Sequence, residues 1–151
     1  MYPFDRFNER AKGVLARAED VARLAHHAYV GTEHLLIGLL GDDAALAAVA
    51  LSNLGVEINR ARAAVESALA QSERRVTEQI IPTLGVKKVI EFAFEEASRL
   101  KQAQVTTEDL LLGLIREGKG MGAQTLSGMG ITLDKLRAEL DRLRSQSRGE
   151  S

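Results

Sequence analysis

The sequence predicts an all-α protein made of two copies of a four-helix unit, related by a pseudo-two-fold axis. Aromatic residues make up 4% of the 151 residues, while Ala and Leu recur throughout, a composition that favours helices over sheets. Residues 32–40 (TEHLLIGLL) return as residues 107–115 (TEDLLLGLI), an offset of 107 − 32 = 75. Gly55 returns as Gly130 at the same offset, 130 − 55 = 75. One register that holds over separated blocks indicates a tandem repeat.

This register divides the chain into a repeat of residues 7–71 and a second repeat of residues 82–144. The polar stretch 72–81 is followed by Pro82, and we expect it to be the linker between the repeats. The polar end, residues 145–151, is predicted to be a flexible tail.

Apolar residues at helical spacing predict four helices in each repeat. In the first repeat they are expected at residues 8–25, 31–40, 43–54 and 57–71. The counterpart of the last of these is expected at residues 132–144.

Capping residues support these boundaries. Asn8 and Thr83 stand at equivalent positions before the first helix of each repeat, where an N-cap side chain accepts a backbone N–H. Gly55 and Gly130 follow the third helices, at the position where a left-handed C-terminal cap favours glycine.

Charge and composition exclude several classes of function. Twenty basic against 21 acidic residues give a net charge of −1, which argues against a nucleic-acid-binding or membrane-surface protein. The absence of cysteine excludes disulfides and thiolate metal sites. The polar N-terminus is not a signal peptide, and no apolar run approaches the roughly 20 residues that cross a bilayer. We therefore expect a soluble, cytoplasmic protein.

No catalytic, metal or cofactor site is predicted. Residues 113–120 (GLIREGKG) match a phosphate-binding loop as far as Lys119, but Gly120 stands where the loop needs Ser or Thr for magnesium. Gly113 also falls inside a predicted helix, equivalent to Gly38. The three histidines form no H-E-x-x-H motif, and we expect His27 and His34 to make structural hydrogen bonds.

The repeated blocks resemble a known family. Residues 29–40 (YVGTEHLLIGLL), 7–11 (FNERA) and 113–118 (GLIREG) are similar to the motifs of Clp N-terminal repeats, most of all those of the ClpC branch. The resemblance covers about residues 2–144 and implies that residues 1–151 form a single double-repeat domain. In that family the domain sits on an AAA+ unfoldase ring and binds adaptors and substrates, so the implied partners are Clp-system proteins, adaptors or substrate proteins.

The resemblance also implies ligand-binding residues. In ClpC-type domains each repeat can hold a phosphorylated arginine, whose guanidinium contacts a glutamate and whose phosphate contacts a threonine. By position, the first site would consist of Asn8 and Glu33, and the second of Thr83 and Glu108. A carboxylate can accept a guanidinium bidentately, and a helix N-terminus suits a phosphate. The alternative is that both glutamates only complement the helix dipole in the first turn.

The sequence departs from the family pattern around these residues. Asn8 replaces the usual threonine, and residues 106–109 read TTED instead of Gly-Thr-Glu-His. Residues 84–86 (LGV) replace the usual Pro-Arg-Ala, so an arginine is missing there. The two repeats are therefore expected to carry unequal sites.

Three further residues are candidates for a docking surface. Tyr2 and Phe4 resemble the aromatic N-terminal segment of ClpC-type domains, which helps form a hydrophobic docking surface; the alternative is that they only cover the edge of the core. Lys87 could face a ligand near Thr83.

Other functions stay open beside this one. The same domain could act alone, as a decoy or regulator that sequesters such ligands or small peptide antibiotics. A helix-turn-helix nucleic-acid binder is less favoured, because its recognition helix would be rich in Arg, Lys, Asn or Gln. Residues 32–40 and 107–115 are instead mostly Leu, Ile and Gly.

Overall fold

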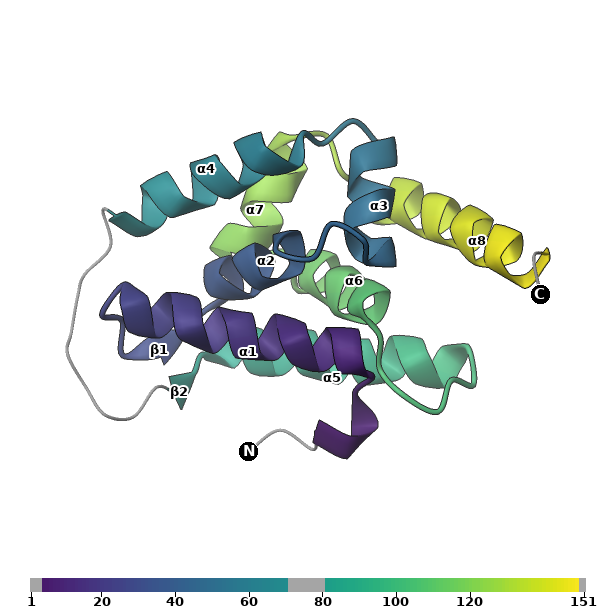
Figure 1. Ribbon diagram of the computed structural model, residues 1–151, viewed down its shortest axis with the longest axis horizontal. Helices are drawn as coiled ribbons and strands as arrows, with labels where there is room; N and C mark the ends of the chain where they lie inside the picture. The colour runs from purple at the N-terminus through teal and green to yellow at the C-terminus, as the bar shows by residue number, and fades with distance from the viewer. Residues whose placement is uncertain (1–3, 71–80, 150–151) are drawn as a thin grey trace.

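The computed structural model describes residues 4–70 and 81–149, and it confirms the all-α double four-helix fold (Figure 1). Most of the predicted linker, residues 72–80, and Tyr2 lie outside the described residues. The first repeat contains η1 (Phe4–Arg6), α1 (Glu9–Leu24), β1 (Tyr29–Val30), α2 (Thr32–Leu40), α3 (Leu46–Asn53) and α4 (Ile58–Ala70). The second contains β2 (Ile81–Pro82), α5 (Leu84–Arg99), α6 (Thr107–Glu117), α7 (Met121–Gly128) and α8 (Leu133–Gly149).

The predicted caps are confirmed. The Asn8 side chain accepts a hydrogen bond from the Ala11 N–H at 2.9 Å, and the Thr83 hydroxyl accepts one from the Val86 N–H at 3.2 Å. Gly55 adopts φ 97°, which is the left-handed conformation that ends a helix most easily at glycine.

Two helix boundaries differ from the prediction. The third helix begins at Leu46 rather than at residue 43, because the Asp42 carboxylate accepts the Ala44 N–H (3.3 Å) and also binds Arg10 (2.7 Å). A side chain that bonds nearby backbone in this way favours a turn over a helix. At the other end, α8 continues past the predicted end at Arg144 to Gly149, so the start of the expected tail is helical.

The two repeats exchange short extended segments. β1 pairs with β2 in parallel, with Val30 opposite Pro82, and an isolated bridge joins Phe7 to Val105. Pro82 is equivalent to Phe7 (82 − 7 = 75), and Val105 is equivalent to Val30 (105 − 30 = 75). The two pairings are therefore the same contact, made once by each repeat with the other. The segment before the first helix of each repeat therefore pairs with the segment before the second helix of the other, as a pseudo-two-fold axis requires.

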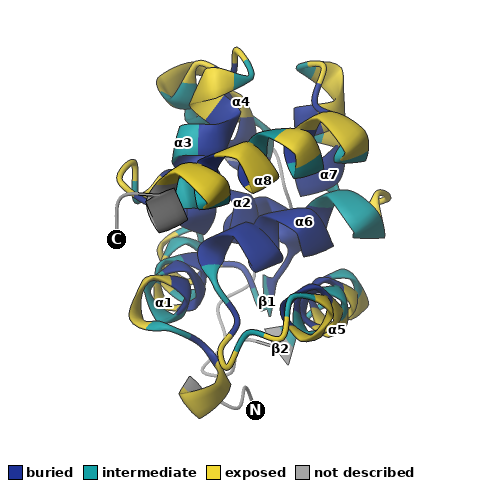
Figure 2. Cartoon of the chain, turned by 90° about the vertical axis from the view of Figure 1, so that its right-hand side faces the viewer, coloured by how far each residue is buried: buried dark blue, intermediate teal, exposed yellow. Residues whose placement is uncertain are grey.

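The helices of the two repeats share one core. α1 packs on α2 and α5 on α6, whereas α3 packs on α8 and α4 on α7 across the repeats. α2 and the first two turns of α6 are buried at the centre (Figure 2). A Cβ atom at Gly38 would lie 2.5 Å from the Val14 carbonyl oxygen, so only glycine permits the close contact between α1 and α2. Gly113 has the same role between α5 and α6, where a Cβ atom would approach the Val89 carbonyl oxygen.

Candidate ligand-binding site

The exchanged segments place each predicted N-cap residue of one repeat beside the segment that leads to the predicted glutamate of the other repeat. The Thr83 N–H donates to the Val30 carbonyl at 3.0 Å, which places Thr83 beside the segment that leads to Glu33. The Asn8 N–H donates to the Val105 carbonyl at 2.9 Å, beside the segment that leads to Glu108. These backbone contacts favour pairs between the repeats, Thr83 with Glu33 and Asn8 with Glu108, over the pairs within each repeat that the sequence predicts.

Glu33 is a buried carboxylate in the first turn of α2. Its Oε2 atom lies 3.4 Å from the Tyr29 hydroxyl, which donates to it. The carboxylate folds back over Gly31, where a side chain would collide with Oε1. Among the described residues, no Lys, Arg or His lies within ion-pair distance of Glu33. A buried carboxylate usually has a cationic partner, so this site lacks a positive charge.

Two histidines hold the loop that carries Glu33. The Gly31 N–H donates to His34 Nδ1 at 2.8 Å, so the His34 proton lies on Nε2, which faces His27 Nδ1 at 2.8 Å. This arrangement places the His27 proton on Nε2, a buried atom without a hydrogen-bond partner in the part of the chain described. Burial, and then the neighbouring His27, lower the pKa of His34 to about 4. The expected structural role of both histidines is therefore confirmed.

The second repeat has a different polar network. Arg144, on α8, lies 3.9 Å from Glu108 Oε2 and 3.5 Å from Asp109 Oδ1. Gln102 donates to Asp109 Oδ2 at 2.7 Å, and the Thr106 N–H donates to the same oxygen at 2.9 Å. Burial raises the pKa of Asp109, although the bonds from Thr106 and Gln102 oppose that shift. The Glu108 carboxylate is thus already paired with a cation.

The repeat register explains why the two sites differ. Arg144 is equivalent to Leu69, since 144 − 75 = 69, so the first repeat has an apolar residue where the second has a cation. Sequence reasoning missed Arg144: the register gives the difference between Leu69 and Arg144, and the packing of α8 places that arginine beside Glu108.

The other candidates take simpler positions. The Thr83 hydroxyl caps α5, and Lys87 is exposed one turn further along that helix. Phe4 begins η1. A docking role for Phe4 and for Tyr2, which lies outside the described residues, stays a prediction.

Within residues 4–70 and 81–149, no group of three His, Asp or Glu side chains is placed to hold a metal ion. No helix of that part of the chain combines the length and apolar character needed to cross a membrane. The apparent phosphate loop is the end of α6, where Gly118 adopts φ 74° as a left-handed cap.

Comparison with known proteins decides the family. The family model described as the Clp repeat N-terminal domain matches residues 6–117 and, a second time, residues 82–151. The chain belongs to the Clp N-terminal domain family. The negative regulator of genetic competence ClpC/MecB of Bacillus subtilis is 41% identical over 149 residues, which is 98% of this chain and 18% of that protein. A ClpA homolog of Cyanidium caldarium is 41% identical over 93% of this chain and 16% of its own length. This Clp N-domain therefore spans under a fifth of these relatives.

Solved structures of the family have the same fold. The N-terminal domain of ClpD from Arabidopsis thaliana has a TM-score of 0.72 and 24% identity, covering 95% of this chain and 97% of that one. The Hsp104 N-terminal domain of Candida albicans has a TM-score of 0.79 at 16% identity, covering 91% of each chain.

Proposed function

We propose that this Clp N-domain is a protein-interaction domain that receives adaptors or tagged substrates for a cytoplasmic Clp AAA+ unfoldase. Its binding site would be formed by Glu33 of α2 and Thr83 at the start of α5. The observation that carries the proposal is the buried Glu33 carboxylate, which has no cationic partner among the described residues. A related fold, the ClpV N-domain, is known in complex with a VipB peptide, and this supports a peptide-binding role.

An arginine side chain fits the chemistry of this site. A guanidinium can bond both oxygens of a carboxylate in parallel, and such charge-assisted bonds are about twice as strong as neutral ones. The Glu33 carboxylate is held in place by the Tyr29 hydroxyl and the His34–Gly31 bond, so little ordering remains to be done on binding.

A phosphorylated arginine would use the second half of the site. The Thr83 hydroxyl keeps its own proton to donate, because it acts as acceptor to the Val86 N–H. The N-terminus of α5 favours an anion, and Lys87 is one turn away. Gly85 keeps the space beside Thr83 free of a side chain, since a Cβ atom there would lie 3.3 Å from Thr32 Cγ2, 3.5 Å from Glu117 Oε2 and 3.6 Å from the Thr83 hydroxyl. The Glu117 carboxylate is an anion beside this position and opposes the phosphate, so the Thr83 hydroxyl, the helix N-terminus and Lys87 must together outweigh it.

The site at Glu108 should be much weaker. Arg144 already neutralises that carboxylate, so an incoming guanidinium must displace a side chain that is anchored on Asp109 as well. We therefore propose one working site for each chain.

Calorimetric titration with free phosphoarginine and with an arginine-phosphorylated peptide tests the proposal. We expect one site in the wild type, loss of binding in Glu33→Gln, and little change in the matched control Glu108→Gln. Thr83→Val should weaken the phosphorylated ligand more than unmodified arginine. Equal binding by wild type and Glu33→Gln, or no binding by the wild type, would contradict the proposal.

A further inference from the structure

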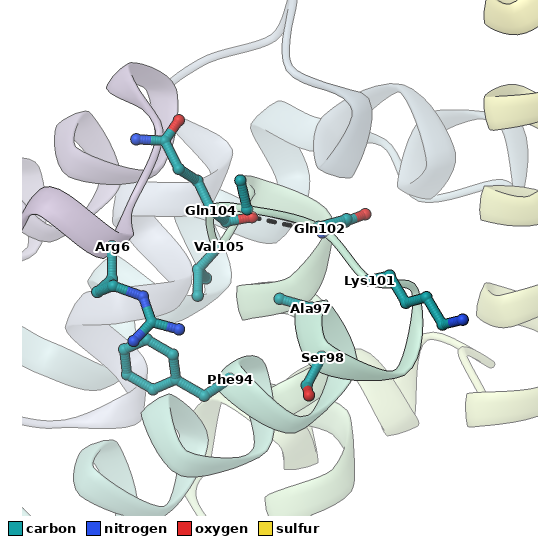
Figure 3. Close-up of a pocket in the computed structure, with 9 residues that line it drawn as sticks. Arg6, Phe94, Ala97, Ser98, Lys101, Gln102, Gln104 and Val105 are labelled. Carbon is teal, nitrogen blue, oxygen red and sulfur yellow. Dashed lines mark hydrogen bonds between the residues drawn. The ribbon is translucent and has the colours of Figure 1, made fainter.

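A small pocket lies at the end of the α1/α5 layer that holds the start of α1. It has a volume of about 320 Å³, at the lower end of the range of about 300–1,000 Å³ found for small-ligand sites. The residues that matter for its chemistry are Phe94, Ala97, Ser98, Lys101, Val105 and Arg6. They come from η1, α5 and the loop between α5 and α6 (Figure 3).

The pocket combines an apolar floor with a cationic rim. Phe94, Ala97 and Val105 supply the floor, and Figure 3 shows Ala97 and Val105 between the side chains of Arg6 and Lys101. None of the residues that line it is Asp or Glu. An apolar ligand that carries a negative charge therefore complements it better than a cation or a neutral polar group.

Arg6 is exposed, lies over the Phe94 ring, and has no anionic partner in the part of the chain that the structure describes. Its guanidinium carbon lies 5.3 Å from the centre of the Phe94 ring, and its carbonyl accepts the Val105 N–H at 2.7 Å. Among the described residues, no carboxylate pairs with Arg6 or Lys101. By contrast, nearby Arg99 is bound to Glu96. A guanidinium that lies over an aromatic ring can still donate hydrogen bonds from its N–H groups to an acceptor beside the ring.

Hydrogen-bond acceptors of the α5 terminus do not compete for this role. The Ser98 carbonyl accepts the Lys101 N–H at 3.0 Å, and the Ala97 carbonyl accepts the Gln102 N–H at 2.9 Å. These two carbonyls are therefore not free to compete as acceptors. The C-terminal end of the α5 dipole still opposes an anion with about half an elementary charge, against the two full positive charges of Arg6 and Lys101.

The repeat symmetry shows that this chemistry is not a by-product of the fold. Glu19 is equivalent to Phe94 (94 − 75 = 19), and Ile81 is equivalent to Arg6 (6 + 75 = 81). By sequence, the first repeat therefore has an acidic residue at the position of Phe94 and an apolar residue at the position of Arg6. The combination of an aromatic residue and a cation is thus specific to one end of the layer.

From these observations we propose that the pocket binds the carboxylate of a peptide partner, with an adjoining apolar side chain on the Phe94 floor. The carboxylate bonds the Arg6 guanidinium, with the Ser98 hydroxyl as a second donor and Lys101 as long-range attraction. The carboxylate can belong to a chain terminus or to an acidic side chain, and the pocket chemistry is the same for both. This site is independent of the Glu33 site.

Titration of the ¹⁵N-labelled chain with three short probes tests the proposal by NMR. Acetyl-Gly-Leu with a free carboxylate should shift the amide signals of Ser98, Gln104 and Val105 in a saturable way. Acetyl-Gly-Leu-amide should bind with about fivefold lower affinity than the free acid. In the Arg6→Gln variant, the affinity for the free acid should fall to that for the amide. Acetyl-Glu-Leu-amide shows whether the bound carboxylate can belong to a side chain, because its affinity will equal that of the free acid only if the pocket accepts a side-chain carboxylate.

A matched control separates the pocket from general charge. Lys88 is exposed on the same helix and pairs with Glu91, so Lys88→Gln removes one charge outside the pocket and should leave binding unchanged. Equal affinity for acid and amide, equal binding by Arg6→Gln and wild type, or shifts confined to other residues would each overturn the proposal. None of these measurements involves arginine ligands or Glu33.

Discussion

The strongest stability prediction concerns Glu96, which joins three helices through one carboxylate. Its side chain is only 2% exposed and accepts hydrogen bonds from Arg99 (3.2 Å), Arg116 (3.0 Å) and Arg137 (2.8 Å). Burial pushes the pKa of Glu96 upward, but the bonds and charges of Arg137 and then Arg99 outweigh it, so the net pKa is lowered. The carboxylate is therefore charged and stabilising at neutral pH.

Replacing Glu96 with Ala should lower the free energy of unfolding by about 2–3 kcal/mol. Removing one partner of a buried ion pair costs roughly 3–5 kcal/mol. The lower value applies here because the three arginine side chains are 23–51% exposed and water can partly replace the carboxylate. In a domain of this size the loss corresponds to a fall in Tm of about 4–12 °C.

Urea unfolding followed by circular dichroism measures this loss, and Glu95→Ala is the matched control. Glu95 is the next residue, is 61% exposed, and has one ion pair, to Arg116 at 2.9 Å. Its removal should cost less than about 1 kcal/mol. If the two variants are destabilised equally, the inference that burial of Glu96 makes its bonds important is refuted.

Three further predictions follow from contacts described above. Gly38→Ala should destabilise the fold by about 2–4 kcal/mol in urea unfolding, because its Cβ would lie 2.5 Å from a backbone oxygen of α1, whereas Gly128→Ala, with nothing within 4 Å, should not destabilise it. His34 has a pKa of about 4 in the folded chain against 6.5 for the free side chain, so the unfolded chain binds more protons between these values. Stability should therefore fall by about 3 kcal/mol as the pH drops from about 6.5 to 4, and a His34→Gln variant should show a flatter pH profile. Arg144→Leu copies Leu69 of the first repeat, and calorimetry with phosphoarginine should then show a second site; unchanged stoichiometry would mean that Arg144 does not block Glu108.

Sequence reasoning predicted the helices and the fold well because the determining signals are local. Apolar spacing, the caps at Asn8 and Thr83, and Gly55 each act within a few residues, and the 75-residue register then relates one repeat to the other. The crossed pairing of the site residues was not predicted, since it depends on contacts between distant segments. The later start of α3 depends on the contact between Arg10 and Asp42, which is equally distant in sequence.

Predictions for the site were limited in the same way. Glu33 and Glu108 occupy matching positions, and although their motifs differ (GTEH and TTED), that local difference does not show which carboxylate is paired with a cation. What distinguishes them is that Arg144 of α8 lies 3.9 Å from Glu108, whereas the equivalent position on α4 is the uncharged Leu69. Only the packed helices show which carboxylate has its charge compensated.

The pairings Phe7–Val105 and Val30–Pro82 join the two repeats of one chain in the way that two subunits of a symmetrical dimer would be joined. Helices of both repeats contribute to one core, with α3 packed on α8 and α4 on α7. We expect an isolated repeat to need a second copy for these contacts, and two identical copies would make each of them twice. Fusing the copies into one chain removes the requirement that both halves be identical. Arg144 can then form an ion pair with Glu108 while the equivalent Glu33 has no such partner among the described residues. In the same way, Phe94 can stand in one repeat where the other has Glu19. Duplication within a single chain thus allows one symmetrical architecture to carry the two different sites proposed here, one at Glu33 and one at Arg6.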